Sequence, residues 1–179
     1  MRFELLLPDA SEDVESLEAV ATNETPAAYV ARVTALKLDA AVARLRSRGL
    51  PSAPVLCSDT TVALGRTIYG KPESPVDAAR MLRELSGKTH RVLTAVAIQK
   101  GKTRTQAVST SQVRFAAMTT AQIRSYVATG EPMGKAGAYA IQGRAAAHIE
   151  HISGSYSGIM GLPMFETAQM LRTLGLKTT

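Results

Sequence analysis

The chain has no tryptophan, a single cysteine and only 4% aromatic residues. One cysteine cannot form an internal disulfide or a thiolate zinc site, so a reducing, cytoplasmic setting is favoured. The scarcity of aromatic side chains argues against a base-stacking surface for nucleic acid. No apolar run reaches the roughly 18 to 20 residues that cross a bilayer, and no signal peptide opens the sequence. We therefore expect a cytoplasmic globular protein with no membrane partner, and nucleic acid is disfavoured as a partner.

Acidic residues are sparse after residue 24. The net charge is +6, yet residues 1–24 hold seven of the 15 acidic residues and one of the 21 basic residues. The remainder therefore has 20 basic against eight acidic residues. A basic body attracts nucleic acid, anionic lipid or a phosphorylated small molecule. Because the basic residues are scattered rather than grouped, a small ligand that carries phosphate fits this balance best.

The length of 179 residues suits one domain, and no repeat or low-complexity linker divides the chain. Helical and strand patterns alternate, with at least two hairpins, which predicts an α/β fold with a mixed sheet and flanking helices. The expected strands cover residues 3–7, 54–58, 61–69 (a hairpin), 91–98, 104–115 and 147–152. The expected helices run over residues 26–47 and 75–85, from a cap at Thr120 to before Gly130, and from Pro163 to before Gly175.

Asp59 is the first candidate for chemistry. It follows the apolar run of residues 55–57, where the chain is expected to turn, and in open α/β sheets ligands gather beyond the carboxyl ends of the strands. A carboxylate held there can accept a proton from water or hold a metal ion. The alternative is an aspartate that only satisfies the amides of a turn.

Two lysines are distinguished by their neighbours. Lys71 stands between a glycine and a rigid proline, which suits an ammonium group presented to phosphate, although a solvated turn lysine has the same pattern. Lys37 shares a helical stripe with Val33 and Ala41. It either extends along the margin of that stripe to solvent or enters a polar pocket at the edge of the core.

Glycine is concentrated late in the chain. Seven of the 13 glycines fall between Gly130 and Gly161, interspersed with hydrogen-bond donors that include Lys135 and Gln142. Glycines let backbone amides approach a ligand closely, although turns and bulges also use them. No P-loop spacing and no Gly-x-Gly-x-x-Gly motif is present, which excludes those two classes of nucleotide site.

Taken in order, a set of short motifs resembles the Maf family over residues 3–175. Each piece is weak alone, but the ordered set is specific. The motifs are Ser58-Asp59-Thr60-Thr61-Val62, Gly70-Lys71-Pro72, Leu85-Ser86-Gly87 with His90, Leu93-Thr94-Ala95-Val96, Gly130-Glu131-Pro132, Gly134-Lys135-Ala136-Gly137-Ala138-Tyr139, Ile141-Gln142-Gly143, Gly154-Ser155-Tyr156 and Gly161-Leu162-Pro163.

The resemblance implies an inosine-triphosphatase-like α/β fold, a homodimer and a divalent metal, Mg or Mn. It implies a nucleoside triphosphate pyrophosphatase that yields a monophosphate and pyrophosphate. The sequence of residues 135–143 is similar to that of the dTTP/UTP branch. Carried over residue by residue, Asp59 matches the proton acceptor, and Thr60 and Gln142 match the positions that select the base. The resemblance further implies a metal near Glu12 and Asp59 and phosphates near Lys37 and Lys71.

The chain departs from the family at one point. The family begins with a strand and a Ser-x-Ser-Pro-Arg-Arg segment that binds the triphosphate, and the 179 residues contain no Ser-Pro-Arg-Arg. A truncated chain, a misassigned start or a lost part of the site would each account for this. We therefore expect a single, N-terminally short domain over residues 1–179 that hydrolyses dTTP weakly, and a chain extended to include the segment to regain activity and melt higher.

Three alternatives remain open at this point. The first is a non-catalytic nucleotide-binding or regulatory protein of septum formation, a role associated with the same family. The second is a pyrophosphatase with a different nucleotide preference. The third is a basic module that binds nucleic acid. Release of pyrophosphate from a panel of nucleotides distinguishes all three.

Overall fold

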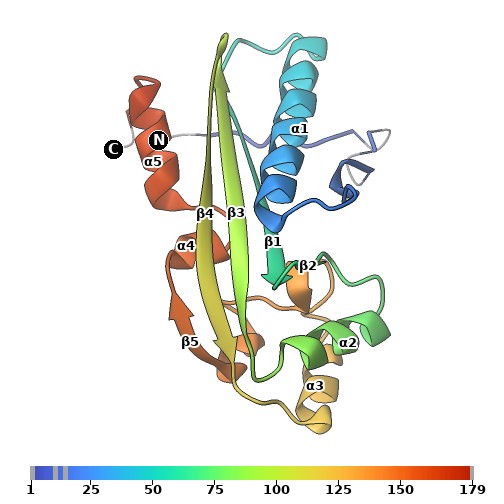
Figure 1. Ribbon diagram of the computed structural model, residues 1–179. Helices are drawn as coiled ribbons and strands as arrows, with labels where there is room; N and C mark the ends of the chain where they lie inside the picture. The colour runs from blue at the N-terminus through green and yellow to red at the C-terminus, as the bar shows by residue number, and fades with distance from the viewer. Residues whose placement is uncertain (1–2, 10–11, 14–15, 178–179) are drawn as a thin grey trace.

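The computed structural model describes residues 3–9, 12–13 and 16–177. Figure 1 shows a long sheet with helices on both faces and at one end. In chain order the elements are η1 (Ser16–Glu18), α1 (Pro26–Ser47), β1 (Val55–Leu64), β2 (Thr67–Tyr69), α2 (Pro75–Leu85), β3 (Thr89–Lys100), β4 (Thr103–Phe115), α3 (Thr120–Val127), η2 (Ala136–Ala138), η3 (Arg144–His148), β5 (Ile149–Ser153), α4 (Tyr156–Ile159) and α5 (Met164–Thr173).

The expected α/β class with flanking helices is confirmed, but the expected mixed sheet is wrong, because the described strands pair only in antiparallel fashion. The strands lie in the order β2-β1-β3-β4-β5, and all four pairings of this described sheet are antiparallel. The long β3–β4 hairpin runs the length of the molecule and joins its two ends (Figure 1). Short turns join β1 to β2 and β3 to β4, as antiparallel partners allow, whereas α2 lies between β2 and β3, and α3, η2 and η3 lie between β4 and β5.

The helix starts follow their capping residues. Thr25 Oγ1 accepts a hydrogen bond from the amide of Ala28 at 3.3 Å, and Ser74 Oγ accepts one from the amide of Asp77 at 3.1 Å. Each cap is followed by a proline whose fixed φ suits the first helical position. The cap of α3 is Thr119 rather than the expected Thr120, and Gln122 completes a capping box with it.

β1 differs from the expected short strand and separate hairpin. It is one strand of ten residues, and it pairs with β3 without a break from Val55 to Ala63. Asp59 therefore lies in the middle of a strand and not after its end. The opposite edge of β1 pairs with β2 only over residues 62–64, so residues 55–61 have no strand beside that edge within the described part of the chain.

The strand expected over residues 3–7 is wrong. Within the described residues the segment has no strand partner, and it runs irregularly past α1 (Figure 1). Arg44 Nη1 donates to the carbonyl of Leu6 at 3.0 Å, and Arg48 Nη2 donates to the carbonyl of Leu7 at 2.9 Å. Arginine side chains therefore take the place that a neighbouring strand would have in satisfying this backbone.

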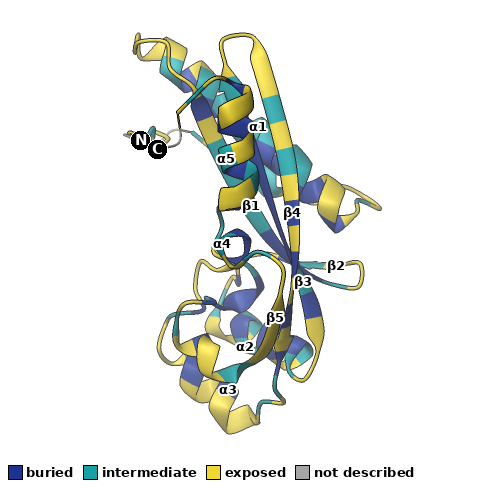
Figure 2. Ribbon diagram, turned by 90° about the vertical axis from the view of Figure 1, so that its left-hand side faces the viewer, coloured by how far each residue is buried: buried dark blue, intermediate teal, exposed yellow. Residues whose placement is uncertain are grey.

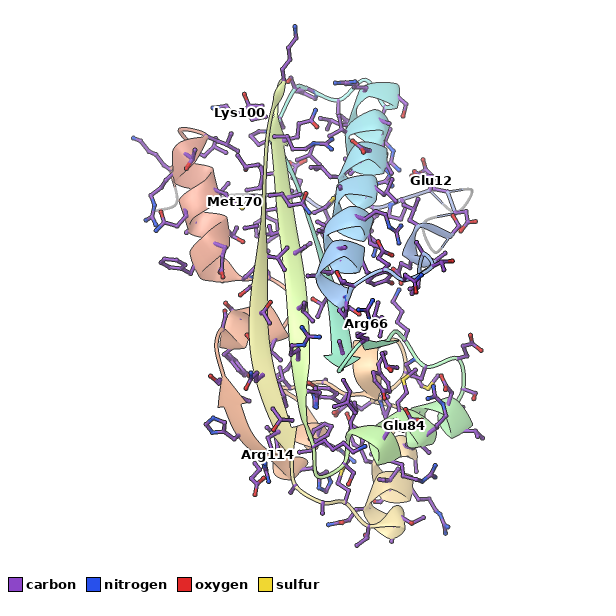
Figure 3. All side chains as sticks on the ribbon, viewed as in Figure 1. Glu12, Arg66, Glu84, Lys100, Arg114 and Met170 are labelled. Atoms are coloured by element: carbon purple, nitrogen blue, oxygen red, sulfur yellow. The ribbon has the colours of Figure 1, made fainter. Side chains whose placement is uncertain are left out.

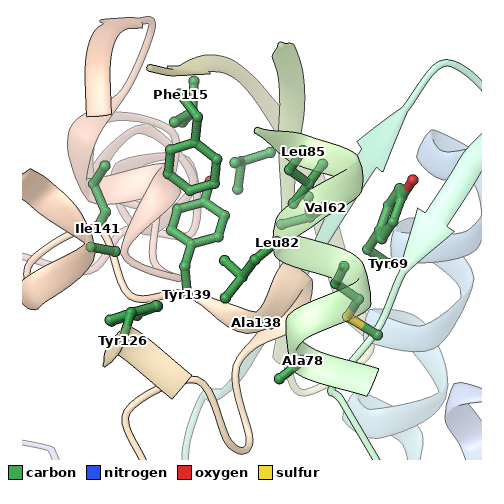
Figure 4. Packing of buried hydrophobic residues seen from close by; sticks show 14 of the residues in the cluster. Val62, Tyr69, Ala78, Leu82, Leu85, Phe115, Tyr126, Ala138, Tyr139 and Ile141 are labelled. Atoms are coloured by element: carbon green, nitrogen blue, oxygen red, sulfur yellow. The ribbon is translucent and has the colours of Figure 1, made fainter. Parts of the chain in front are cut away.

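The core lies on both faces of the sheet (Figure 2). On one face, Val30 and Val33 of α1 pack against Ala63 and Ala95. On the other face, α5 covers the upper half of β3, and the largest cluster fills the lower end around Tyr139, with residues of α2, α3 and η2 (Figure 4). This arrangement puts helix α1 on one side of β1 and the loops after α3 on the other.

Candidate active site

The alternation of β1 sends Asp59 and Thr60 to opposite faces of the sheet. Asp59 points to the face that α1 covers, as Ala63 does four residues later. Thr60 points to the other face, like Val62, whose side chain lies under Gly137 of η2. The two residues are neighbours in sequence, yet they contact different layers of the protein.

Asp59 belongs to a cluster of charged side chains. Lys37 Nζ, from α1, donates to Asp59 Oδ1 at 2.5 Å and to Glu18 Oε1 at 2.7 Å. Lys71 Nζ, from the loop after β2, donates to the same Glu18 oxygen at 3.0 Å. The structure thus brings together three of the residues expected at the site, Lys37, Asp59 and Lys71, and adds a fourth, Glu18.

The cluster has the electrostatics of a proton-transfer site. Burial raises the pKa of Asp59 above its ordinary value, and the hydrogen bond from Lys37 only partly opposes this. Burial also acts against the charge of Lys37, but its bonds to Asp59 and Glu18 outweigh that and raise its pKa. A carboxylate with a raised pKa is a stronger base than an ordinary aspartate, which suits it to accept a proton.

On the other face, the hydroxyl group of Thr60 is hydrogen-bonded to a second threonine hydroxyl. Thr60 Oγ1 lies 2.9 Å from Thr94 Oγ1 on β3, and Thr94 donates to the carbonyl of Gly158 in α4 at 2.6 Å. Gln142 lies nearby on the exposed loop between η2 and η3. The residues expected to select a base therefore gather on this face.

One cavity of about 310 Å³ joins the two faces. It can do so because β1 has no strand beside residues 55–61 at that edge in the described chain. A ligand in this cavity meets charged groups on one side of β1 and neutral hydrogen-bonding groups on the other. The lining residues from both faces include Glu18, Asp59, Thr60, Lys71, Lys135 and Gln142.

Hydrogen bonds to Glu131 stabilise the loop that presents Gln142. The carboxylate of Glu131 accepts hydrogen bonds from the Tyr126 hydroxyl at 2.8 Å and from the amide of Arg144 at 3.0 Å. A Cβ at Gly143 would lie only 2.3 Å from Glu131 Oε1, so glycine is required for this close approach. Part of the late glycine cluster therefore shapes this loop.

The sequence comparison decides the family. The family described as "Maf-like protein" matches residues 1–174. The chain belongs to the Maf family. Among its relatives, a protein named "dTTP/UTP pyrophosphatase" from Albidiferax ferrireducens is 68% identical over 99% of this chain and 88% of the relative.

Two further relatives carry the same printed name. The protein from Polaromonas sp. is 66% identical, again over 99% of this chain and 88% of the relative. The protein from Ralstonia nicotianae is 62% identical over 96% of this chain and 83% of the relative. The Maf family is therefore matched along nearly the whole chain.

Glu12, expected near the metal with Asp59, lies elsewhere in this Maf chain (Figure 3). Its carboxylate accepts from Arg44 Nε at 2.7 Å and from Arg44 Nη2 at 2.5 Å, and these bonds hold the pKa of Glu12 at about 2. Arg44 is seven residues after Lys37, or about 10 Å further along α1. The buried guanidinium of Arg44 thus takes Glu12 as its partner, and Glu18 contacts the cluster instead.

Sequence reasoning missed Glu18 because seven acidic residues crowd residues 1–24 and nothing in their spacing singles one out. Glu18 and Asp59 have no third metal-ligating side chain beside them. Within residues 3–9, 12–13 and 16–177, no group of three or more His, Cys, Asp or Glu side chains could hold a metal by itself. In the same residues no helix is long and apolar enough to span a membrane.

Proposed function

We propose that this Maf-family chain hydrolyses dTTP and UTP to the nucleoside monophosphate and pyrophosphate. The observation that carries the proposal is one cavity whose lining includes Asp59 and Lys71 on one face of β1 and Thr60 with Gln142 on the other, with Lys37 bonded to Asp59. A nucleotide has the same division, with a charged triphosphate at one end and a neutral base at the other. The relatives named "dTTP/UTP pyrophosphatase" support this substrate class.

The chemistry assigns a role to each charged side chain. Asp59 accepts a proton from a water molecule while the oxygen of that water attacks the α-phosphorus. The bond from that phosphorus to the bridging oxygen breaks, and pyrophosphate leaves with the electron pair. Lys37 and Lys71 place positive charge beside the phosphate oxygens, where negative charge develops. Lys37 also holds the Asp59 carboxylate in place through its hydrogen bond.

The donor set fits a hard divalent cation. Mg²⁺ and Mn²⁺ bind through one or two carboxylates completed by substrate phosphates and water, and Glu18 and Asp59 are two carboxylates that share one lysine at the cavity. Bound there, the cation would neutralise charge on the triphosphate and polarise its phosphorus–oxygen bonds. This assignment replaces Glu12 with Glu18 as the partner of Asp59.

The test is pyrophosphate release from dTTP, UTP, CTP, dATP and GTP, with Mg²⁺ or Mn²⁺ and long incubations that register slow turnover. We expect the monophosphate and pyrophosphate from dTTP and UTP, at higher rates than from the purine nucleotides. Release of orthophosphate would refute cleavage at the α-phosphorus. Tight nucleotide binding without any product would favour the regulatory alternative instead.

The homodimer implied by the family resemblance is also a proposal. Light scattering coupled to size-exclusion chromatography measures the mass directly, and we expect twice the 19.0 kDa of one chain. A mass of one chain at micromolar concentration would contradict it.

A further inference from the structure

The hydroxyl of Thr60 is part of a directed chain of hydrogen bonds. Thr60 and Thr94 are direct cross-strand partners in the β1–β3 ladder, and their Oγ1 atoms are 2.9 Å apart. Thr94 Oγ1 is also 2.6 Å from the carbonyl oxygen of Gly158. Either threonine could donate in the first contact, but a carbonyl oxygen can only accept in the second.

The carbonyl therefore fixes the direction of the whole chain. A hydroxyl carries one proton, and Thr94 gives its proton to Gly158. The contact between the two threonines is then a hydrogen bond only if Thr60 donates to Thr94. Thr60 has no second proton, so its oxygen presents only lone pairs to the cavity that it lines.

The arrangement around Thr94 resists reversal. Thr94 is 1% exposed, so no solvent competes for its hydroxyl. A Cβ at Gly158 would lie 3.2 Å from the side chain of Ser155 and 3.3 Å from Ser109 Oγ, so the Gly158 backbone is closely packed. Turning the Thr60 hydroxyl toward a ligand would leave two oxygens facing each other without a proton between them, and it would cost the hydrogen bond.

Resting on the proposed function, we infer that Thr94 makes Thr60 an obligatory hydrogen-bond acceptor, and that Thr60 thereby selects uracil and thymine over cytosine. The ring nitrogen N3 of uracil and thymine carries a proton and donates to such an acceptor. N3 of cytosine has a lone pair and meets the Thr60 oxygen as a second acceptor. Thr94, which does not line the cavity, is thus a positioning residue for base specificity.

The test compares kcat/KM for UTP and CTP in the unmodified chain and in four variants. The unmodified chain should prefer UTP by about tenfold or more, the value of one hydrogen bond gained and one repulsion avoided. Thr94→Val keeps the shape but frees the Thr60 proton to turn toward cytosine N3, so the ratio should fall about tenfold. Thr94→Ser retains the hydroxyl and should keep the ratio.

Thr167→Val is the matched control. Thr167 is 4% exposed on α5, and its hydroxyl has no hydrogen-bond partner among the described residues. The control should keep the ratio of the unmodified chain, because it removes a buried hydroxyl without touching Thr60. Melting curves for all variants separate a change in specificity from a change in folding.

Thr60→Val provides a second route if Thr94→Val does not fold. It removes the acceptor at the cavity, so the rate with UTP should fall while the rate with CTP rises. Equal losses on both nucleotides, or a UTP preference that survives in Thr94→Val, would overturn the inference alone. An unmodified chain that turns over UTP and CTP equally, or neither, would overturn the proposed substrate preference and this inference with it.

Discussion

Replacing Lys37 with Met should disable Asp59 while preserving the fold. Methionine has a similar unbranched stem, and Lys37 shares its helical stripe with Val33 and Ala41, which are buried. The change removes the ammonium that donates to both Asp59 and Glu18. A hydrogen bond to a charged group contributes about 1.5–3 kcal/mol, so we expect kcat/KM with dTTP to fall about 10- to 150-fold.

The pH profile identifies the cause of that loss. Burial already raises the pKa of Asp59, and the hydrogen bond from Lys37 is the largest influence that lowers it. Without Lys37 the pKa of Asp59 rises further, so the carboxylate form that can accept a proton appears only at higher pH. The acidic limb of kcat/KM, measured by pyrophosphate release across pH 5 to 9, should move to higher pH.

Lys71→Met is the matched control for this shift. Lys71 donates to Glu18 and makes no hydrogen bond to Asp59 in the described structure, and its charge lowers the pKa of Asp59 less than Lys37 does. Its loss should therefore weaken phosphate binding and move the acidic limb less than the loss of Lys37. An unchanged limb in Lys37→Met, or the same displacement in both variants, would refute the reasoning that Lys37 tunes Asp59.

Three further outcomes follow from other residues. Burial lowers the pKa of His90 to about 4, so the unfolded chain binds more protons than the folded chain below about pH 6.5. The free energy of unfolding, measured by denaturant titration, should therefore fall by about 2 kcal/mol from pH 7 to pH 5. His90→Gln should not show this loss. Gly143→Ala should lower the free energy of unfolding by about 1–3 kcal/mol, because its Cβ would clash with Glu131, whereas Gly70→Ala, with no atom within 4 Å of its Cβ, should melt like the unmodified chain. Gln142→Ala should reduce the preference for dTTP over GTP about tenfold without changing the melting temperature, and an unchanged preference would exclude Gln142 from base selection.

Local signals in the sequence predict the helices well. Thr25-Pro26 and Ser74-Pro75 combine a capping side chain with a proline, and both helices begin there in the structure. The same kind of reasoning fails for β1, since a polar stretch after an apolar run looks like a strand end. Pairing with β3 carries the strand through these polar residues, and such pairing is not visible in the local sequence.

The site is less predictable than the helices. The helical spacing leaves two fates open for Lys37, and only the packing of α1 on β1 brings its ammonium to Asp59. Whether Glu12 or Glu18 lies beside Lys37 and Asp59 depends on the tertiary contact between Arg44 and Glu12, which no spacing in the sequence predicts. The role of Thr94 depends on a backbone carbonyl 64 positions along the chain.

The most direct test of the proposed mechanism is pyrophosphate release from dTTP by Asp59→Asn, expressed relative to the unmodified chain under the same conditions. Asparagine keeps the shape of the side chain but cannot accept a proton at neutral pH. We expect the rate to fall by about 10²- to 10⁴-fold, the usual contribution of a general base, with nucleotide binding still measurable. A variant that releases pyrophosphate at close to the unmodified rate would contradict the role of Asp59 as the proton acceptor.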